Sequence, residues 1–149
     1  MGNKKFNITP LPYLAQLAPC YGRIAFDFNL DNNLDLLICG NSYSNHFTQG
    51  ELAASRGLLM TGDGMGNFRA ISADKSGMSI NKDSKAMALL YNNTQDRYNI
   101  IISNNNDSLV VYKHNQLPEK TSSVGSRKGK SEIYYGGGYL SQSTMKIHN

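Results

Sequence analysis

Short apolar runs separated by polar or glycine-rich segments dominate the first half of the chain. Short runs bounded by turn signals are typical of β-strands, and tight turns between consecutive strands favour antiparallel neighbours. The runs are Arg23–Phe26, Leu34–Gly40, Gly57–Met60 and Phe68–Ile71. They predict an up-and-down antiparallel unit of four strands. The polar excursion Asn41–Arg56 interrupts it, with a helical turn expected near Gln49–Ser55.

A weaker copy of this pattern follows roughly sixty residues later. Lys85–Tyr91 and Tyr98–Ser103 have the character of the first two predicted strands, and Ser108–Lys113 corresponds to the third. The loop Asn92–Arg97 joins the first two strands of this copy and contains a single carboxylate, Asp96. We therefore expect an all-β fold with a second, degenerate sheet that holds no metal in its loop.

The loop between the first two predicted strands has oxygen-bearing side chains at alternate positions. They are Asp27, Asn29, Asp31, Asn33 and Asp35. Alternate residues of an extended loop point the same way, and three carboxylates that lie close together repel each other unless a cation lies between them. Hard oxygen ligands suit Ca²⁺ better than a transition metal. We expect calcium to be bound by four of these side chains and by the backbone carbonyl of Asn33.

This loop is not an EF-hand. That motif needs a glutamate at its twelfth position and a glycine at its sixth, where this chain has Ile38 and Asn32. Asparagine enters the left-handed region readily, so the sharp turn remains compatible with the sequence. The alternative interpretation is an asparagine-rich and aspartate-rich turn without a metal.

Size and charge narrow the classes of protein. The chain has 149 residues, 40% of them apolar, and no tryptophan, which is typical of one domain or of part of a larger protein. No apolar run is long enough to cross a bilayer, and the first six residues lack the apolar stretch of a signal peptide. We expect any secretory leader to lie outside this sequence. The net charge of +4 comes without a basic stripe that alternates with aromatic residues, which disfavours nucleic-acid binding.

The two cysteines, Cys20 and Cys39, are far apart in sequence. Cys39 lies in an apolar run and is interpreted as a small buried hydrophobic residue. Two cysteines do not make a disulfide framework, and whether they pair is left open.

Several motifs resemble FG-GAP or VCBS-type repeats. The resemblance rests on Asp27–Asp35 with the apolar strand that follows it, and on the glycine-rich turn Gly62–Phe68. Segments similar to a subgroup of secreted bacterial repeat proteins are Leu11–Pro19, Ala54–Leu59 and Tyr134–Ser143, the last of which resembles an ASPIC-type carboxy-terminal segment. The family builds integrin-α-like β-propellers, and the resemblance implies that Asp27, Asn29, Asp31, Asn33 and Asp35 bind calcium between the first two strands of a blade.

The chain departs from the family at three positions. Leu30 and Asn32 stand where the family usually has glycine, and Ala53 stands where the subgroup often has aspartate. A propeller takes at least about four blades, and this chain supplies about two. We therefore expect the carboxy-terminal part of a propeller, or a partial propeller that self-associates through open sheet edges or covers an edge with its tail.

The resemblance divides the chain into five parts. They are a lead-in at residues 1–20, a first blade with the calcium loop at 21–72, a degenerate second blade at 73–116, a flexible linker at 117–131 and an ASPIC-like segment at 132–149. In the last part, Tyr134, Tyr135 and Tyr139 lie beside glycines and are candidate ligand contacts, because exposed rings form platforms for sugars or peptides. The alternative is that these rings pack on the blade.

No coherent catalytic set is found. The histidines, His46, His114 and His148, occur in unrelated polar contexts and are interpreted as surface residues, and Asp63 and Asp74 are interpreted as turn and loop residues. We expect a non-catalytic, calcium-stabilised binding or scaffold module, extracellular, periplasmic or on the cell surface, that presents loops to a protein or glycan. The alternative is an accessory part of an enzyme that acts on polysaccharide.

Overall fold

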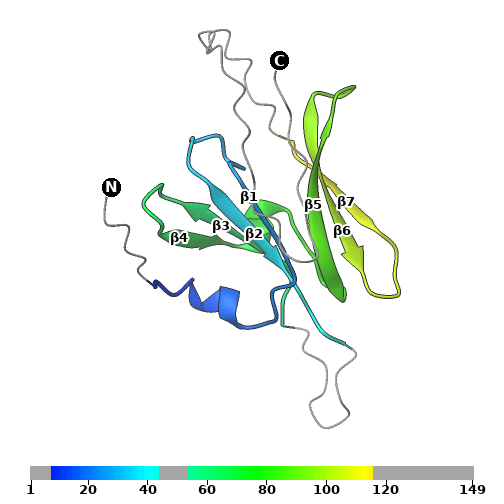
Figure 1. Cartoon of the computed structure of the whole chain (residues 1–149), viewed down its shortest axis with the longest axis horizontal. Helices are drawn as coiled ribbons and strands as arrows, with labels where there is room; N and C mark the ends of the chain where they lie inside the picture. The colour runs from blue at the N-terminus through cyan, green and yellow to red at the C-terminus, as the bar shows by residue number, and fades with distance from the viewer. Residues whose placement is uncertain (1–7, 44–53, 116–149) are drawn as a thin grey trace, which may run out of the picture.

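The computed structural model describes residues 8–43 and 54–115. Seven strands account for most of the regular structure in these residues (Figure 1). The strands are β1 (Gly22–Phe26), β2 (Asp35–Cys39), β3 (Leu58–Gly62), β4 (Phe68–Ile71), β5 (Ser84–Asn92), β6 (Arg97–Asn104) and β7 (Val110–Lys113). Two single turns of helix, η1 (Tyr13–Gln16) and α1 (Ala73–Ser76), complete the described elements.

The strands form two antiparallel sheets. One has the order β1-β2-β3-β4 and the other has the order β5-β6-β7. The predicted all-β fold with an up-and-down, four-stranded antiparallel unit is therefore confirmed. The second sheet has three strands within the described residues, an arrangement consistent with a partial propeller. The helical turn expected near residues 49–55 lies largely outside the described residues, and Ser55 is not helical.

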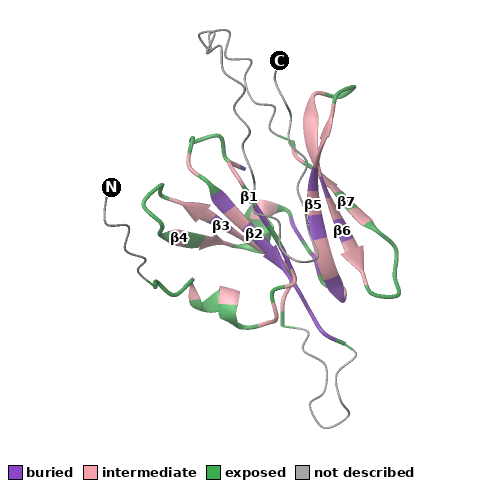
Figure 2. Cartoon of the chain, viewed as in Figure 1, coloured by how far each residue is buried: buried purple, intermediate pink, exposed green. Residues whose placement is uncertain are grey.

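Buried and exposed residues alternate along the strands, which explains why these segments pair as they do. In β1, Gly22 and Ile24 are buried and Arg23 and Ala25 are exposed, so one face turns toward the core. The central strand β2 is buried at four of its five positions (Figure 2). Successive residues of a strand point to opposite faces, so both faces of β2 are covered, and its sequence is accordingly a continuous apolar run.

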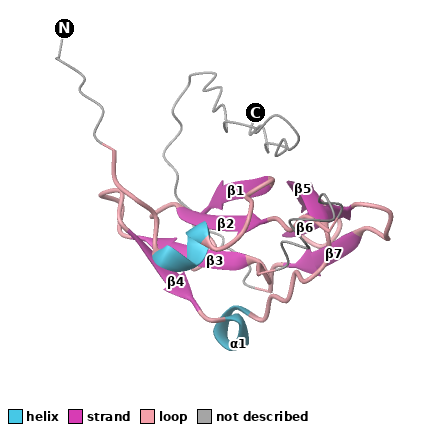
Figure 3. Ribbon diagram, turned by 90° about the horizontal axis from the view of Figure 1, so that it is seen from below, coloured by secondary structure: helices cyan, strands magenta, loops and turns pink. Residues whose placement is uncertain are grey.

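The two sheets share one hydrophobic core, with β1 next to β5 (Figures 1 and 3). Leu37 and Met87 are among its most deeply buried members. Gly22 makes the close approach of the sheets feasible, because a Cβ there would lie 2.9 Å from Met87 Cγ and 3.0 Å from the Met87 backbone nitrogen. The core members are Ile24, Phe28, Leu37, Cys39, Met78, Ile80, Met87, Leu89, Ile100 and Ile102.

The two helical turns were not expected from the sequence. In α1, Ser72 precedes the first helical residue, and Gly77 ends the turn with φ +68° and donates its N–H to the Ala73 carbonyl. Such a short turn has no apolar periodicity, so only its end signals were available. No helix within the described part of the chain is long and apolar enough to cross a bilayer.

Both cysteines are free thiols. Cys39 is 1% exposed, as its position in an apolar run predicted. Burial raises the pKa of the Cys39 thiol to about 12. Burial also raises the pKa of Cys20, against the opposing charge of Arg23. Both pKa shifts keep the thiols protonated at neutral pH, so they are poor nucleophiles.

We predict that Leu37→Ala destabilises the protein strongly, because Leu37 is fully buried between the sheets. Truncating a buried leucine removes transfer free energy and leaves a cavity, for a loss of about 2–5 kcal/mol. Leu34→Ala is the matched control, because Leu34 is 56% exposed. Chemical denaturation of both variants measures the difference. Equal losses of unfolding free energy would contradict the placement of Leu37 in the shared core.

Candidate functional site

The acidic loop, Asp27–Leu34, connects β1 to β2, and Phe26 pairs with Asp35 at its base. The two strands are antiparallel neighbours, so the loop closes a hairpin as the sequence predicted. Asn29, Leu30, Asp31 and Asn32 are exposed at its tip. The loop therefore projects polar oxygen atoms toward solvent from a rigid pair of strands.

Asp27, Asn29 and Asp31 are brought together around the backbone of the loop. The Asp31 N–H donates to Asp27 Oδ1 and to Asn29 Oδ1, each at 3.1 Å. The other Asp27 oxygen accepts the Asn32 N–H at 2.8 Å, and the Asn29 amide donates to Asp31 Oδ2 at 2.8 Å. Three of the five predicted ligands thus lie in one network of hydrogen bonds.

The charge of Asp31 is stabilised within this network. Its Oδ1 accepts the Asn33 N–H at 2.8 Å. That bond and the Asn29 amide hold the pKa of the Asp31 carboxyl below its usual value, outweighing a small desolvation effect in the opposite direction. The carboxylate is ionised at neutral pH and lies at the exposed tip of the loop.

Asp35 has a different set of partners. The carboxylate is 1% exposed. It accepts the Phe28 N–H at 3.0 Å through Oδ2 and the Gly62 N–H at 3.0 Å through Oδ1. These bonds join the loop, β2 and β3 at one buried point. Whether Asp35 also serves as a metal ligand stays a prediction.

Asn33 faces the glycine-rich turn after β3. A Cβ at Gly64 would lie 2.4 Å from Asn33 Oδ1, and a Cβ at Gly62 would lie 2.2 Å from the Leu34 carbonyl oxygen. Only glycine fits this contact without displacement. The two turns, one acidic and one glycine-rich, therefore pack directly on each other at one end of the first sheet.

Asp63 closes its own turn. Its Oδ1 accepts the N–H groups of Met65 and Asn67, and its Oδ2 accepts the Asn67 amide at 2.6 Å. The Asn67 amide, followed by the Met65 N–H, lowers the pKa of the Asp63 carboxyl. Asp74 lies in α1. Asp63 is therefore a turn residue, as the sequence indicated, whereas Asp74 belongs to a single turn of helix.

Two loop residues adopt the left-handed conformation that glycine would adopt without strain. Leu30 has φ +62° and Asn32 has φ +67°. These are the two positions at which the resemblance inferred from the sequence would predict glycine. Asparagine tolerates this region, whereas leucine pays a steric penalty of roughly 1–2 kcal/mol. The loop adopts its sharp turns although neither of these two residues is glycine.

Aromatic side chains anchor the base of the loop. Phe28 is 8% exposed, and its ring lies 5.2 Å from that of Phe26. Phe26 in turn contacts Tyr98 of β6 at 4.7 Å. His114, which the sequence placed at the surface, is half-buried instead and lies with Nε2 2.8 Å from the Phe28 carbonyl oxygen. These contacts connect the loop to the second sheet.

The three tyrosines predicted as ligand contacts, Tyr134, Tyr135 and Tyr139, lie outside the described residues. In residues 8–43 and 54–115, no group of three or more histidine, cysteine, aspartate or glutamate side chains is arranged to hold a metal ion. The loop network described above consists of carboxylates together with asparagine oxygens.

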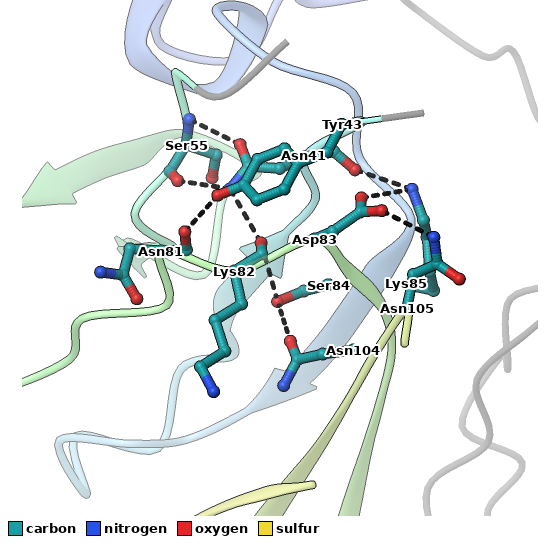
Figure 4. A network of polar contacts seen from close by, with 10 residues as sticks. All are labelled: Asn41, Tyr43, Ser55, Asn81, Lys82, Asp83, Ser84, Lys85, Asn104 and Asn105. Carbon is teal, nitrogen blue, oxygen red and sulfur yellow. Dashed lines mark hydrogen bonds and ion pairs between the residues drawn. The ribbon is translucent and has the colours of Figure 1, made fainter. Parts of the chain in front are cut away.

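A polar junction lies near the starts of β3 and β5 (Figure 4). Asn41 is 1% exposed and follows β2. Its amide donates to the Ser55 carbonyl at 2.9 Å and to the Lys82 carbonyl at 3.0 Å, and its Oδ1 accepts the Ser55 N–H at 3.0 Å. One buried side chain thus satisfies backbone groups from two distant segments.

Asp83 is the charged centre of the junction. It is 5% exposed. Its Oδ1 lies 2.6 Å from Lys85 Nζ, and its Oδ2 accepts the Asn105 amide at 3.0 Å. Lys85 Nζ also donates to the Asn41 carbonyl at 2.9 Å and lies 4.4 Å from the centre of the Tyr21 ring. The junction therefore joins both sheets through charge as well as through hydrogen bonds.

An open polar pocket of about 450 Å³ adjoins the junction. Its lining residues are Tyr43, Asn81, Lys82, Asp83, Asn105, Asn106 and Asp107. Sequence reasoning missed this site, because its residues come from three separate segments and form no motif. The available signal was the pair of asparagine-rich stretches that follow predicted strands.

We predict that Asp35→Asn destabilises the protein by about 1–3 kcal/mol even in the absence of calcium, because the new amide group faces a backbone N–H donor. Asp31→Asn is the matched control, since Asp31 is exposed. Unfolding in the presence of EDTA measures both variants. If the two variants lose the same free energy of unfolding, the structural role of Asp35 is refuted.

We predict a pH-dependent contribution from Asp83. Burial alone would raise the pKa of this carboxyl, but Lys85, Asn105 and the Tyr43 N–H together lower it. The contribution is therefore present above the unfolded pKa of about 4 and is lost as the pH falls through the lower folded pKa. Asp83→Asn should cost roughly 1–3 kcal/mol at pH 7, and the difference should shrink in acid. The control is Asp74→Asn at an exposed position. A difference independent of pH would contradict this account.

Comparisons with known proteins do not assign the chain to a family. The chain matches no protein-family model, no curated protein and no solved structure. The function inferred for it therefore rests on the acidic loop, the polar junction and the pocket.

Proposed function

We propose that this chain is a non-catalytic binding or scaffold module, stabilised by calcium, of a secreted or cell-surface repeat protein. One observation carries the proposal. Asp27, Asn29 and Asp31 lie in one exposed network of hydrogen bonds, and no lysine or arginine within the described residues forms an ion pair with Asp27 or Asp31. The two carboxylates thus have no cationic partner from the described part of the chain.

The chemistry of the donor set fits calcium. The loop offers carboxylate and amide oxygens and no nitrogen or sulfur ligand, and hard cations prefer such donors. Asp27, Asn29 and Asp31 are the residues that would hold the ion, with Asn33 and Asp35 as the further ligands that the family resemblance implies. A bound calcium ion would supply positive charge and cross-link the tip of the loop.

The loop is well placed to stabilise the whole module. Asp35 ties its base to β3, and Phe28 ties it to the shared core and, through its carbonyl oxygen, to His114. A cation that rigidified the tip would therefore act on a segment in contact with both sheets. This coupling supports a structural role for calcium in a module that presents its loops to a protein or glycan.

The enzymatic alternative has less support. An enzymatic interpretation would use Asp63 and Asp74 as a pair of acids. Asp63 closes the turn after β3, and Asp74 lies in α1. The buried Asp83 carboxylate contacts Lys85 and Asn105. No observation in the described residues favours a catalytic role over a binding role.

We predict that calcium raises the thermal midpoint of unfolding. A ligand at ten times its dissociation constant adds about 1.4 kcal/mol to the stability of the native state. The dissociation constant is expected to be on the order of 10⁻⁴–10⁻³ M, as in extracellular calcium modules. Thermal denaturation in EDTA and in millimolar calcium measures the effect, and magnesium serves as a comparison.

Matched variants localise this effect. Asp27→Asn and Asp31→Asn should each abolish most of the calcium response, and Asp74→Asn, an exposed acid outside the loop, should retain it. A calcium response that is absent from the unmodified protein, or that survives in both loop variants, would refute calcium binding at this loop.

A further inference from the structure

We propose that the pocket beside the polar junction binds an uncharged saccharide. This inference rests on the proposed binding function and narrows its ligand from a protein or glycan to a glycan. It does not depend on the calcium loop. The pocket has a volume of about 450 Å³ and opens to solvent. That volume lies within the range of about 300–1,000 Å³ for small-molecule sites, so a short saccharide fits.

Two charged residues of the pocket lining, Lys82 and Asp107, pair with each other, and the third, Asp83, pairs with Lys85, which lies outside the lining. Lys82 Nζ lies 2.8 Å from Asp107 Oδ2, and Lys85 Nζ lies 2.6 Å from Asp83 Oδ1. Each carboxylate of the pocket therefore already has an ammonium partner. A site of this kind offers no net attraction to a phosphate or to a divalent cation. The ligand that best fits it is polar and neutral.

The floor of the pocket is rigid, which favours recognition. Asp83 is 5% exposed and is held by Lys85 and by the Asn105 amide. Near it, the Asn41 side chain bridges the backbones of Ser55 and Lys82 (Figure 4). A pre-organised site binds with a smaller loss of conformational entropy than a site that must order itself.

Amide groups supply free hydrogen-bonding capacity at the rim. Asn105 and Asn106 are exposed. Within the described residues, no hydrogen bond engages the Asn106 side chain, and the Asn105 side chain only donates, to Asp83. Amides both donate and accept, as sugar hydroxyl groups do, so the two groups are complementary. A saccharide replaces bound water at this rim with directional partners.

Tyr43 supplies an aromatic surface. The residue is 37% exposed, and its hydroxyl group donates a hydrogen bond to the Asn81 carbonyl. The bond fixes the orientation of the ring, so its face is available at little entropic cost. An aromatic face beside amide groups suits a ring with one apolar face and several hydroxyl groups. The pocket has no comparable apolar subsite for a hydrophobic peptide side chain among its lining residues.

The test uses saturation-transfer NMR on the full chain. The probes are the methyl glycosides of glucose, galactose and N-acetylglucosamine, with inorganic phosphate and tetraglycine as charged and peptide comparators. We expect transfer to at least one glycoside and none to the comparators. Asn106→Gly should weaken that binding by about three- to tenfold, the value of one hydrogen bond. This variant preserves the backbone, because Asn106 has φ +52°, which glycine adopts freely.

Two further variants complete the test. Tyr43→Ala should abolish glycoside binding, and Tyr13→Ala, at a 74% exposed tyrosine outside the pocket, should leave it unchanged. The proposal is overturned if no glycoside binds, if a comparator binds in its place, or if Asn106→Gly binds as tightly as the unmodified protein. Repeating the measurements in EDTA and in calcium separates the two proposals. If the protein shows no calcium response, glycoside binding can still be measured and interpreted. If the protein responds to calcium but binds no glycoside, only the saccharide site is refuted.

Discussion

The buried carboxylate of Asp35 is the constraint on which the described structure most depends. It is 1% exposed and accepts N–H groups from Phe28 and Gly62. A buried charge is stable only when its oxygens are satisfied, so its position fixes both donors. The Phe28 donor holds the base of the acidic loop, and the Gly62 donor holds the end of β3. The loop, the central strand and the glycine-rich turn are thereby set in one arrangement.

Polar contacts connect the two sheets on each side of the shared core. Toward the acidic loop, His114 Nε2 lies 2.8 Å from the Phe28 carbonyl oxygen. At the junction, the Asn41 side chain donates to the Lys82 carbonyl, and Lys85 Nζ donates to the Asn41 carbonyl. Apolar burial alone lets two sheets slide past each other, because it is non-directional. Directional bonds on both sides restrict that movement, which is the property that a scaffold for exposed loops requires.

The sequence predicted the strands more accurately than it predicted the sites. Strand positions follow from local apolar runs and turn signals, and β4 was predicted with its exact bounds. The junction depends on contacts across long separations in sequence, such as that between Asn41 and Lys82, which are 41 positions apart. No local pattern indicates such a contact. The same limit explains His114, whose polar neighbours in sequence gave no sign of its contact with Phe28.

Hydrogen bonds within the protein already fix the turn of the acidic loop. Leu30 and Asn32 adopt the left-handed backbone, and the Asp27 carboxylate accepts the N–H groups of Asp31 and Asn32 in the same turn. Those hydrogen bonds lie within the protein and need no ion. In the proposed function, calcium would therefore act mainly on the charge of a turn that is already formed. A cation that binds a turn that is already formed pays little ordering entropy.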